Sequence, residues 1–110
     1  MDDTTADDER WLVVDGRRWR RTDPSLPDDL VTALTSHLGR GRSGVRVAKK
    51  SDDSAAGAAA VAAARTRVGL AKLGLGERGE PWWERPESDR IAQARASLRD
   101  LDDLDSRGIS

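Results

Sequence analysis

Gly76-Glu77-Arg78-Gly79-Glu80-Pro81-Trp82-Trp83-Glu84 is the stretch that decides the fold of this chain. Inside a helix, glycine and proline are less favourable than alanine by about 1 and about 3 kcal/mol, so the stretch is predicted to be a loop. A helix-favouring run precedes it, and another run with apolar periodicity follows it. The loop, over 75–85, should therefore join two helices and reverse the chain.

Trp82 and Trp83 are two of only four aromatic residues in a chain that has no Phe and no Tyr. A packed tryptophan buries on the order of 150–250 Å². Because most of the other apolar residues are alanine, we expect both rings to belong to the structural core at this chain reversal. The alternative is an exposed aromatic clamp that binds a partner.

Asp15-Gly16 lies between two β-favouring runs and predicts a two-stranded hairpin over 10–21. A type I′ turn needs positive φ at both central positions, which Asp-Gly accepts. The turn sets four cross-strand pairs: Val14 with Arg17, Val13 with Arg18, Leu12 with Trp19, and Trp11 with Arg20.

Side chains alternate between the two faces of a strand, so this register divides the hairpin into an apolar face and a mixed face. The apolar face holds three residues: Leu12, Val14 and Trp19. A lone hairpin is marginal in water, so we expect this face to pack on the helices as part of the core. On the other face, the register suits a cation–π pair between Trp11 and Arg20. That face is interpreted either as a solvated strand face shielded by arginine stems or as an Arg–Trp surface that grips phosphates and stacks on bases.

Apolar and small residues recur with helical spacing over 26–50, 53–74 and 86–104. Ser25 is the expected N-cap of the first helix. Gly39, Gly41 and Gly44 favour a break in that helix, whereas its uninterrupted apolar phase favours continuity. In a continuous helix, Gly41 and Gly44 face inward and permit close approach of the alanine-rich second helix.

The predicted fold class is therefore α+β, mostly α: an N-terminal two-stranded hairpin packed on an antiparallel helical hairpin, plus a C-terminal third helix. Residues 10–104 form one small domain. Residues 1–9, with five acids and no base, have the composition of a disordered tail, and residues 105–110 form a second tail. Four Asp residues close to the end of the third helix oppose its dipole, so the helix should fray near 104.

Composition excludes several classes of chemistry. The 110 residues include no Cys, which removes disulfides, thiolate metal sites and a cysteine nucleophile. The single imidazole, His37, lies on or beside an apolar stripe and is interpreted as a boundary residue rather than a ligand or base. No apolar run is long enough to span a membrane and no signal segment is evident, so the cytoplasm is the expected location. We expect no catalytic residue, no cofactor and no metal.

The hairpin sequence from Trp11 to Pro24, followed by the stretch from Gly76 to Glu84, resembles a family of small bacterial proteins without an established activity. Automated labels for that family sometimes read "biopolymer transporter Tol". The resemblance covers roughly residues 10–100 and implies no site residue, cofactor or partner. The chain has neither a membrane-spanning run nor a propeller repeat that would fit a transporter label.

Two functions follow as hypotheses. The first is a non-enzymatic module for protein–protein interaction or regulation, whose partner is an unknown protein or a second copy of this chain. The alternative is a nucleic-acid-binding module that uses the arginine-rich hairpin and the basic stretch 40–50. The candidate interaction surface comprises six residues: Trp11, Arg18, Arg20, Arg40, Arg42 and Arg46.

Overall fold

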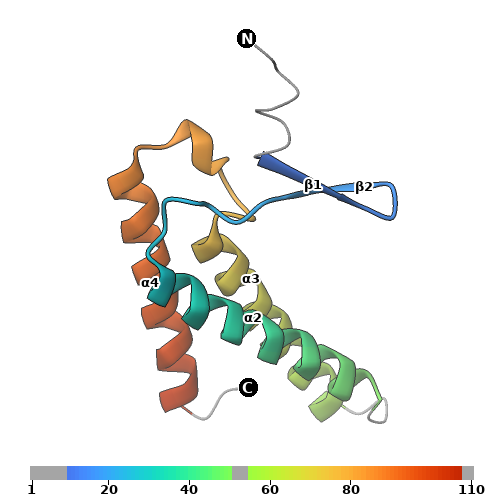
Figure 1. Ribbon diagram of the computed structural model, residues 1–110. Coiled ribbons are helices and arrows are strands. Elements are labelled where there is room, and N and C mark those ends of the chain that lie inside the picture. Colours follow the sequence, from blue (N-terminus) through green and yellow to red (C-terminus); the bar gives the residue numbers. More distant parts are fainter. Residues whose placement is uncertain (1–9, 51–54, 108–110) are drawn as a thin grey trace.

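A computed structural model describes residues 10–50 and 55–107. These residues form a β-hairpin and three long helices, which confirms the predicted mostly α, α+β class (Figure 1). The elements follow in the order β1 (Trp11–Val14), β2 (Arg17–Arg20), α2 (Asp28–Lys49), α3 (Ala55–Leu75), the 3-10 turn η1 (Trp82–Glu84) and α4 (Glu87–Ser106). The tail predicted at 1–9 lies outside the described residues, as does the last part of the tail predicted at 105–110.

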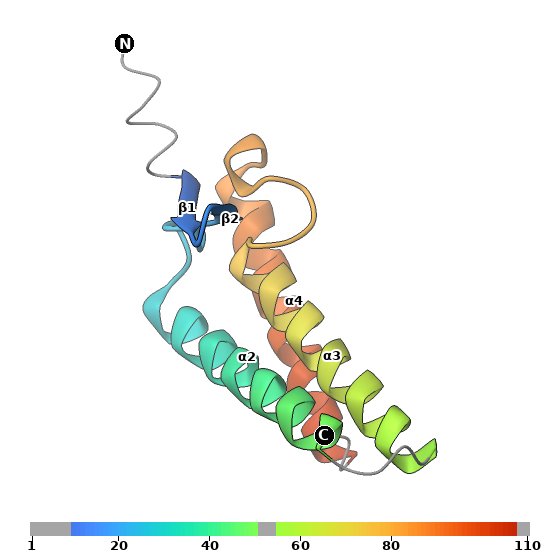
Figure 2. The same ribbon diagram turned by 90° about the vertical axis from the view of Figure 1, so that its right-hand side faces the viewer.

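The hairpin has the predicted turn and register. Asp15 and Gly16 adopt φ values of 52° and 79°, as a type I′ turn requires. Trp11 pairs with Arg20, and Leu12 pairs with Trp19. The hairpin lies at one end of the helical unit, beside the loop that joins α3 to α4 (Figures 1 and 2).

The first helix is continuous from Asp28 to Lys49, so the glycines do not break it. Gly41 is buried where α2 meets α3. A Cβ atom at this position would lie 3.1 Å from the backbone nitrogen of Val68 and 3.2 Å from the carbonyl oxygen of Ala64. The predicted close approach of the two helices is therefore confirmed, and the missing side chain makes it possible.

Substitution by alanine at Gly39 and at Gly41 should change the stability of the protein in opposite directions. Gly39→Ala should raise the free energy of unfolding by about 0.5–1 kcal/mol, because its Cβ meets no atom within 4 Å and alanine favours the helix. Gly41→Ala should lower that free energy by about 1–3 kcal/mol, because α3 would have to move away. Urea denaturation of both variants tests the pair, and equal effects would contradict the close approach.

Most of the buried core comes from the helices alone. Its members are leucines of α2, with Leu26 just before that helix, closed by residues of α3 and α4: Leu26, Leu30, Leu34, Leu38, Ala71, Leu75, Ala94 and Leu101. None of the helices in the described residues is long and apolar enough to cross a bilayer.

The expected core role of the hairpin face was wrong. Leu12, Val14 and Trp19 are 42%, 46% and 41% exposed. The physical reason is that Leu75 and Leu101, both almost fully buried, already close the leucine stripe of α2. The hairpin is not needed to cover that stripe.

The two tryptophans of the loop differ from each other. Trp82 is 8% exposed, so its predicted core role is confirmed. Trp83 is only half-buried, which corrects its assignment to the core. It packs between the ring of Trp82, at 5.2 Å between centroids, and the ring of Trp11, at 5.6 Å. Trp83 therefore joins the loop to β1 rather than filling the helical core.

The helix ends also depart from expectation. Ser25 does not cap α2, because its backbone N–H and its hydroxyl both donate to Asp23 Oδ1. The capping position belongs to Pro27. At the other end of the chain, α4 continues to Ser106 and not to 104. Its terminal acids are stabilised by basic residues of the other helices, described below.

Candidate functional site

The hairpin is held by polar contacts with the loop that follows α3. Arg20 Nη1 donates to the carbonyl oxygens of Gly79, at 2.9 Å, and Gly76, at 3.3 Å. Thr22 Oγ1 donates to Glu77 Oε2 at 2.7 Å. These bonds attach the base of the hairpin, so its turn projects beyond the helices (Figure 1).

The predicted cation–π pair between Trp11 and Arg20 was wrong. Arg18 stacks on Trp11 instead, with its guanidinium carbon 4.4 Å from the ring centroid. The loop carbonyls explain the difference, because they accept hydrogen bonds from Arg20 and draw its guanidinium away from Trp11. Trp11 is thereby covered on two sides, by Arg18 and by Trp83.

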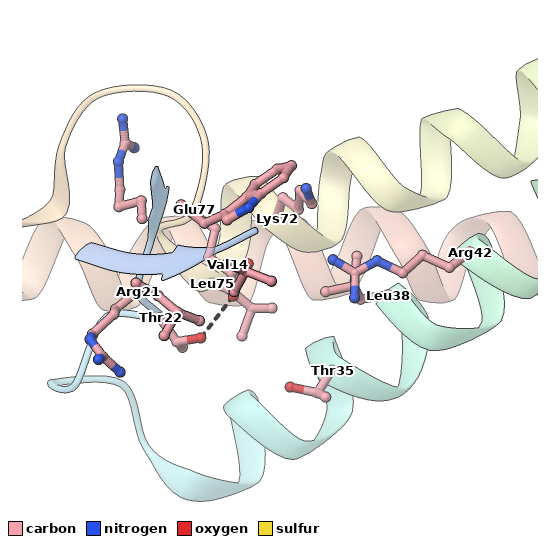
Figure 3. Close-up of a pocket in the computed structure, with 12 residues that line it drawn as sticks. Val14, Arg21, Thr22, Thr35, Leu38, Arg42, Lys72, Leu75 and Glu77 are labelled. Carbon is pink, nitrogen blue, oxygen red and sulfur yellow. Dashed lines mark hydrogen bonds between the residues drawn. The ribbon is translucent and has the colours of Figure 1, made fainter. Parts of the chain in front are cut away.

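An open groove of about 890 Å³ lies between the apolar face of the hairpin and the helices α2 and α3. Figure 3 shows Thr35, Leu38 and Arg42 along α2, with Lys72 and Leu75 on α3. The wall on the other side consists of hairpin residues: Leu12, Val14 and Trp19. We call this space the hairpin groove. Because its outer wall keeps about two-fifths of its surface exposed, the groove is a surface feature rather than an enclosed cavity.

Positive charge gathers on the helical side of the groove. The pKa of Lys72 lies below its ordinary value, first because burial removes water from the ammonium group, and then because Arg42 and Arg78 repel its charge. Lys72 Nζ also lies 5.2 Å from the centroid of the Trp19 ring. The opposing acid in the groove, Glu77, already accepts the hydrogen bond from Thr22.

The structure separates the six residues predicted as an interaction surface. Arg20 and Arg42 line the hairpin groove, whereas Arg18 stacks on Trp11 on the other face of the hairpin. Arg40 forms a two-bond ion pair with Asp105 of α4. Arg46 donates to Ser43 within its own helix. The basic residues predicted from the sequence therefore do not form one continuous patch.

A polar cluster with a buried centre connects the three helices, and the sequence interpretation missed it. Arg67, 2% exposed, donates to Asp105 Oδ1 at 2.7 Å and to His37 Nδ1 at 2.6 Å. His37 is 6% exposed, so it is a buried residue and not a boundary one. The available signal was the position of Arg67 on the inward stripe of its helix, between Ala64 and Ala71.

His37, Asp102 and Asp105 offer metal-ligand atoms within 4.8 Å of one another. The surroundings do not suit a cation. A guanidinium can only donate, so His37 Nδ1 accepts from Arg67, and the ring proton lies on Nε2, 3.3 Å from Asp102 Oδ1. A metal at Nε2 would force a proton onto Nδ1, against the guanidinium. We interpret the cluster as an ion-pair network that joins the helices.

This network should make stability depend on pH. Hydrogen bonds from Arg40 and Arg67 hold the pKa of Asp105 well below its ordinary value of 3.8. A carboxyl whose pKa is lowered by folding stabilises the protein above its unfolded pKa, and this contribution is lost as the pH falls below that value. Asp105→Asn should therefore cost more stability at pH 6 than at pH 3. Unfolding free energies at both pH values test this, with the exposed Asp100→Asn as the control.

Comparisons with known protein families, curated proteins and solved structures gave no match. The resemblance stated from the sequence remains a prediction.

Proposed function

We propose that this chain is a non-enzymatic interaction module that holds a segment of a partner protein in the hairpin groove. One observation carries the proposal: Leu12, Val14 and Trp19 are exposed, face a groove, and are not needed by the core. Large apolar side chains gathered on one exposed surface are a feature of protein-binding sites. The open outer wall also argues against a small ligand, since such ligands are usually enclosed over most of their surface.

Quantitative affinity purification from the native cell tests the proposal. The full chain is compared with the double variant Leu12→Thr/Trp19→Thr, in which threonine keeps the β-propensity of the strands. Val47→Thr is the control, because Val47 is 66% exposed on α2 and lies outside the groove. We expect the partner to be recovered with the wild type and the control and to be depleted with the groove variant. Equal recovery with all three proteins would contradict the proposal.

Self-association is a narrower form of the same function. Exposed alanines on α3, such as Ala58, Ala59 and Ala62, are available for a helix-to-helix contact between two copies. Size-exclusion chromatography with light scattering, from micromolar to millimolar chain concentration, tests it. A monomer at every concentration would remove the second copy as the partner.

Nucleic-acid binding is the second candidate, favoured by the charge balance. Residues 1–9 and 51–54 contain seven of the twenty acids, which leaves thirteen acids in the described residues, against all nineteen Lys and Arg. Against it, Arg20 and Arg40 already bond to protein oxygens. Fluorescence anisotropy with mixed-sequence DNA and RNA at about 50 and about 200 mM salt decides the matter, because phosphate contacts weaken steeply with salt. Absence of binding at the lower salt would remove this candidate.

A further inference from the structure

A second cavity adjoins the hairpin groove. It has a volume of about 410 Å³ and shares Arg42 with the groove. Its other lining residues are two valines and two arginines: Val45, Val68, Arg65 and Arg78. The groove and this cavity thus adjoin along α2, α3 and the loop after α3. Six cations line them, including Arg20 and Arg21 of the hairpin, and we call the other four the basic face: Arg42, Arg65, Lys72 and Arg78.

The basic face contrasts with two arginines that form ion pairs inside the structure. Arg67 pairs with Asp105, and Arg90 pairs with Asp23. Among the ion pairs of residues 10–50 and 55–107, none involves a cation of the basic face. The pKa of Lys72 is lowered first by burial and then by repulsion from Arg42 and Arg78, each of which outweighs the attraction of Glu77. The face therefore carries positive charge that the described residues do not neutralise by ion pairing.

Charge and apolar surface occur together at this face. The exposed Leu12 and Val14 line the groove that Arg42 and Lys72 also line, and Val68 lines the second cavity with Arg65. An occupant needs apolar side chains for the leucines and valines and negative charges for the cations. Complementary charge between two protein surfaces speeds their encounter and excludes wrong partners.

We infer that the partner segment held by the hairpin groove is acidic and amphipathic, with large apolar side chains against the exposed apolar face of the hairpin and carboxylates against the basic face. This inference rests on the proposed function and adds the chemistry of the partner. Phosphate groups fit the surface less well, because leucine and valine offer them no hydrogen bond. The exposed ring of Trp19 is also a poor platform for stacking bases, since Arg17 and Lys72 already lie against it at 5.0 and 5.2 Å.

The test is an unbiased selection for peptides. A library of random twelve-residue peptides is selected on the immobilised full chain, and peptides that also bind Leu12→Thr/Trp19→Thr are removed. We expect the enriched peptides to carry net negative charge together with two or more large apolar residues. Their binding should weaken as salt rises, because salt screens charges on exposed surfaces.

Matched charge variants then probe the basic face. Arg42→Gln/Lys72→Gln should weaken binding of the enriched peptides by about tenfold or more, because both cations line the groove. Arg46→Gln/Lys49→Gln removes the same charge from exposed positions of α2 outside both cavities. Its effect should stay below about twofold, as long-range charge effects are screened. Circular dichroism of both variants confirms that the helices are retained.

The outcomes separate the two proposals. Enriched peptides that need Leu12 and Trp19 but show no acidic bias would overturn the inference and leave the groove as a binding site. The inference is also overturned if Arg42→Gln/Lys72→Gln binds them as tightly as the wild type. If no selected peptide requires Leu12 and Trp19 for binding, the result would contradict the proposal that the hairpin groove is a binding site. In a competition experiment, mixed-sequence DNA is compared with the same peptides added free in solution. Displacement of the bound peptides at a lower concentration of DNA than of free peptide would assign the basic face to nucleic acid instead.

Discussion

Trp82→Ala should lower the free energy of unfolding by about 3–5 kcal/mol, the usual range for removal of a buried aromatic side chain. Trp82 is 8% exposed, and its Nε1 donates to the carbonyl oxygen of Arg21 at 3.0 Å. The ring therefore links the loop after α3 to the chain that leaves β2. A domain of this size has a stability of about 5–15 kcal/mol, so the variant should lose a large part of it.

Chemical denaturation followed by circular dichroism measures this loss. Trp82→Phe is the matched variant, because it keeps an aromatic ring but removes the hydrogen bond to Arg21. Its expected loss is smaller, about 1–3 kcal/mol, the cost of leaving a buried polar group unsatisfied. A loss below about 1 kcal/mol for Trp82→Ala would mean that the ring lies at the surface in solution.

Arg67→Ala should also lower the free energy of unfolding, by about 2–4 kcal/mol, because it empties the space of a buried side chain and leaves the buried His37 Nδ1 without its donor. Arg67 lies between α2 and α4 and donates to residues of both, His37 Nδ1 and Asp105 Oδ1. The planar guanidinium reaches the two acceptors at once. Arg67→Lys keeps the charge but has a single nitrogen at its end, so it should also be destabilising, by about 1–3 kcal/mol.

Arg95→Ala is the control for Arg67, because Arg95 is exposed on α4. Its effect should stay within about 0.5 kcal/mol, as for most surface positions. Equal stability of Arg67→Ala and Arg95→Ala would contradict a structural role for the buried cluster.

The elements of the fold could be predicted because their signals are local. Asp15-Gly16 specifies its turn by positive φ, and the register of the hairpin follows from it. The apolar phase of α2 continues across its glycines, and Gly41 lies where the phase puts it, against α3. Whether the hairpin face packs on the helices could not be predicted from the hairpin sequence alone. Alternation places Leu12 beside Trp19, but it does not say that Leu75 and Leu101 already cover α2.

The polar parts of the structure were harder to predict, since they join residues far apart in the chain. Asp102 and Asp105 looked unfavourable at the end of a helix, where the dipole repels negative charge. In the fold, Asp105 is paired with Arg40 and Arg67 of two other helices. Within the candidate site, Arg20 and Arg42 were predicted, whereas Lys72 was not. Its role follows only from the fold, which places Lys72 over the ring of Trp19 and within the electrostatic range of Arg42.

The central claim is that the apolar face of the hairpin is a free surface over a groove and not part of the core. The free energy of unfolding of Trp19→Thr, obtained by denaturant titration, tests this claim most directly. We expect a loss of about 1 kcal/mol or less, because Trp19 is 41% exposed and its described ring contacts are with the cations Arg17 and Lys72. A loss of about 3 kcal/mol or more, as for a buried aromatic residue, would contradict the claim.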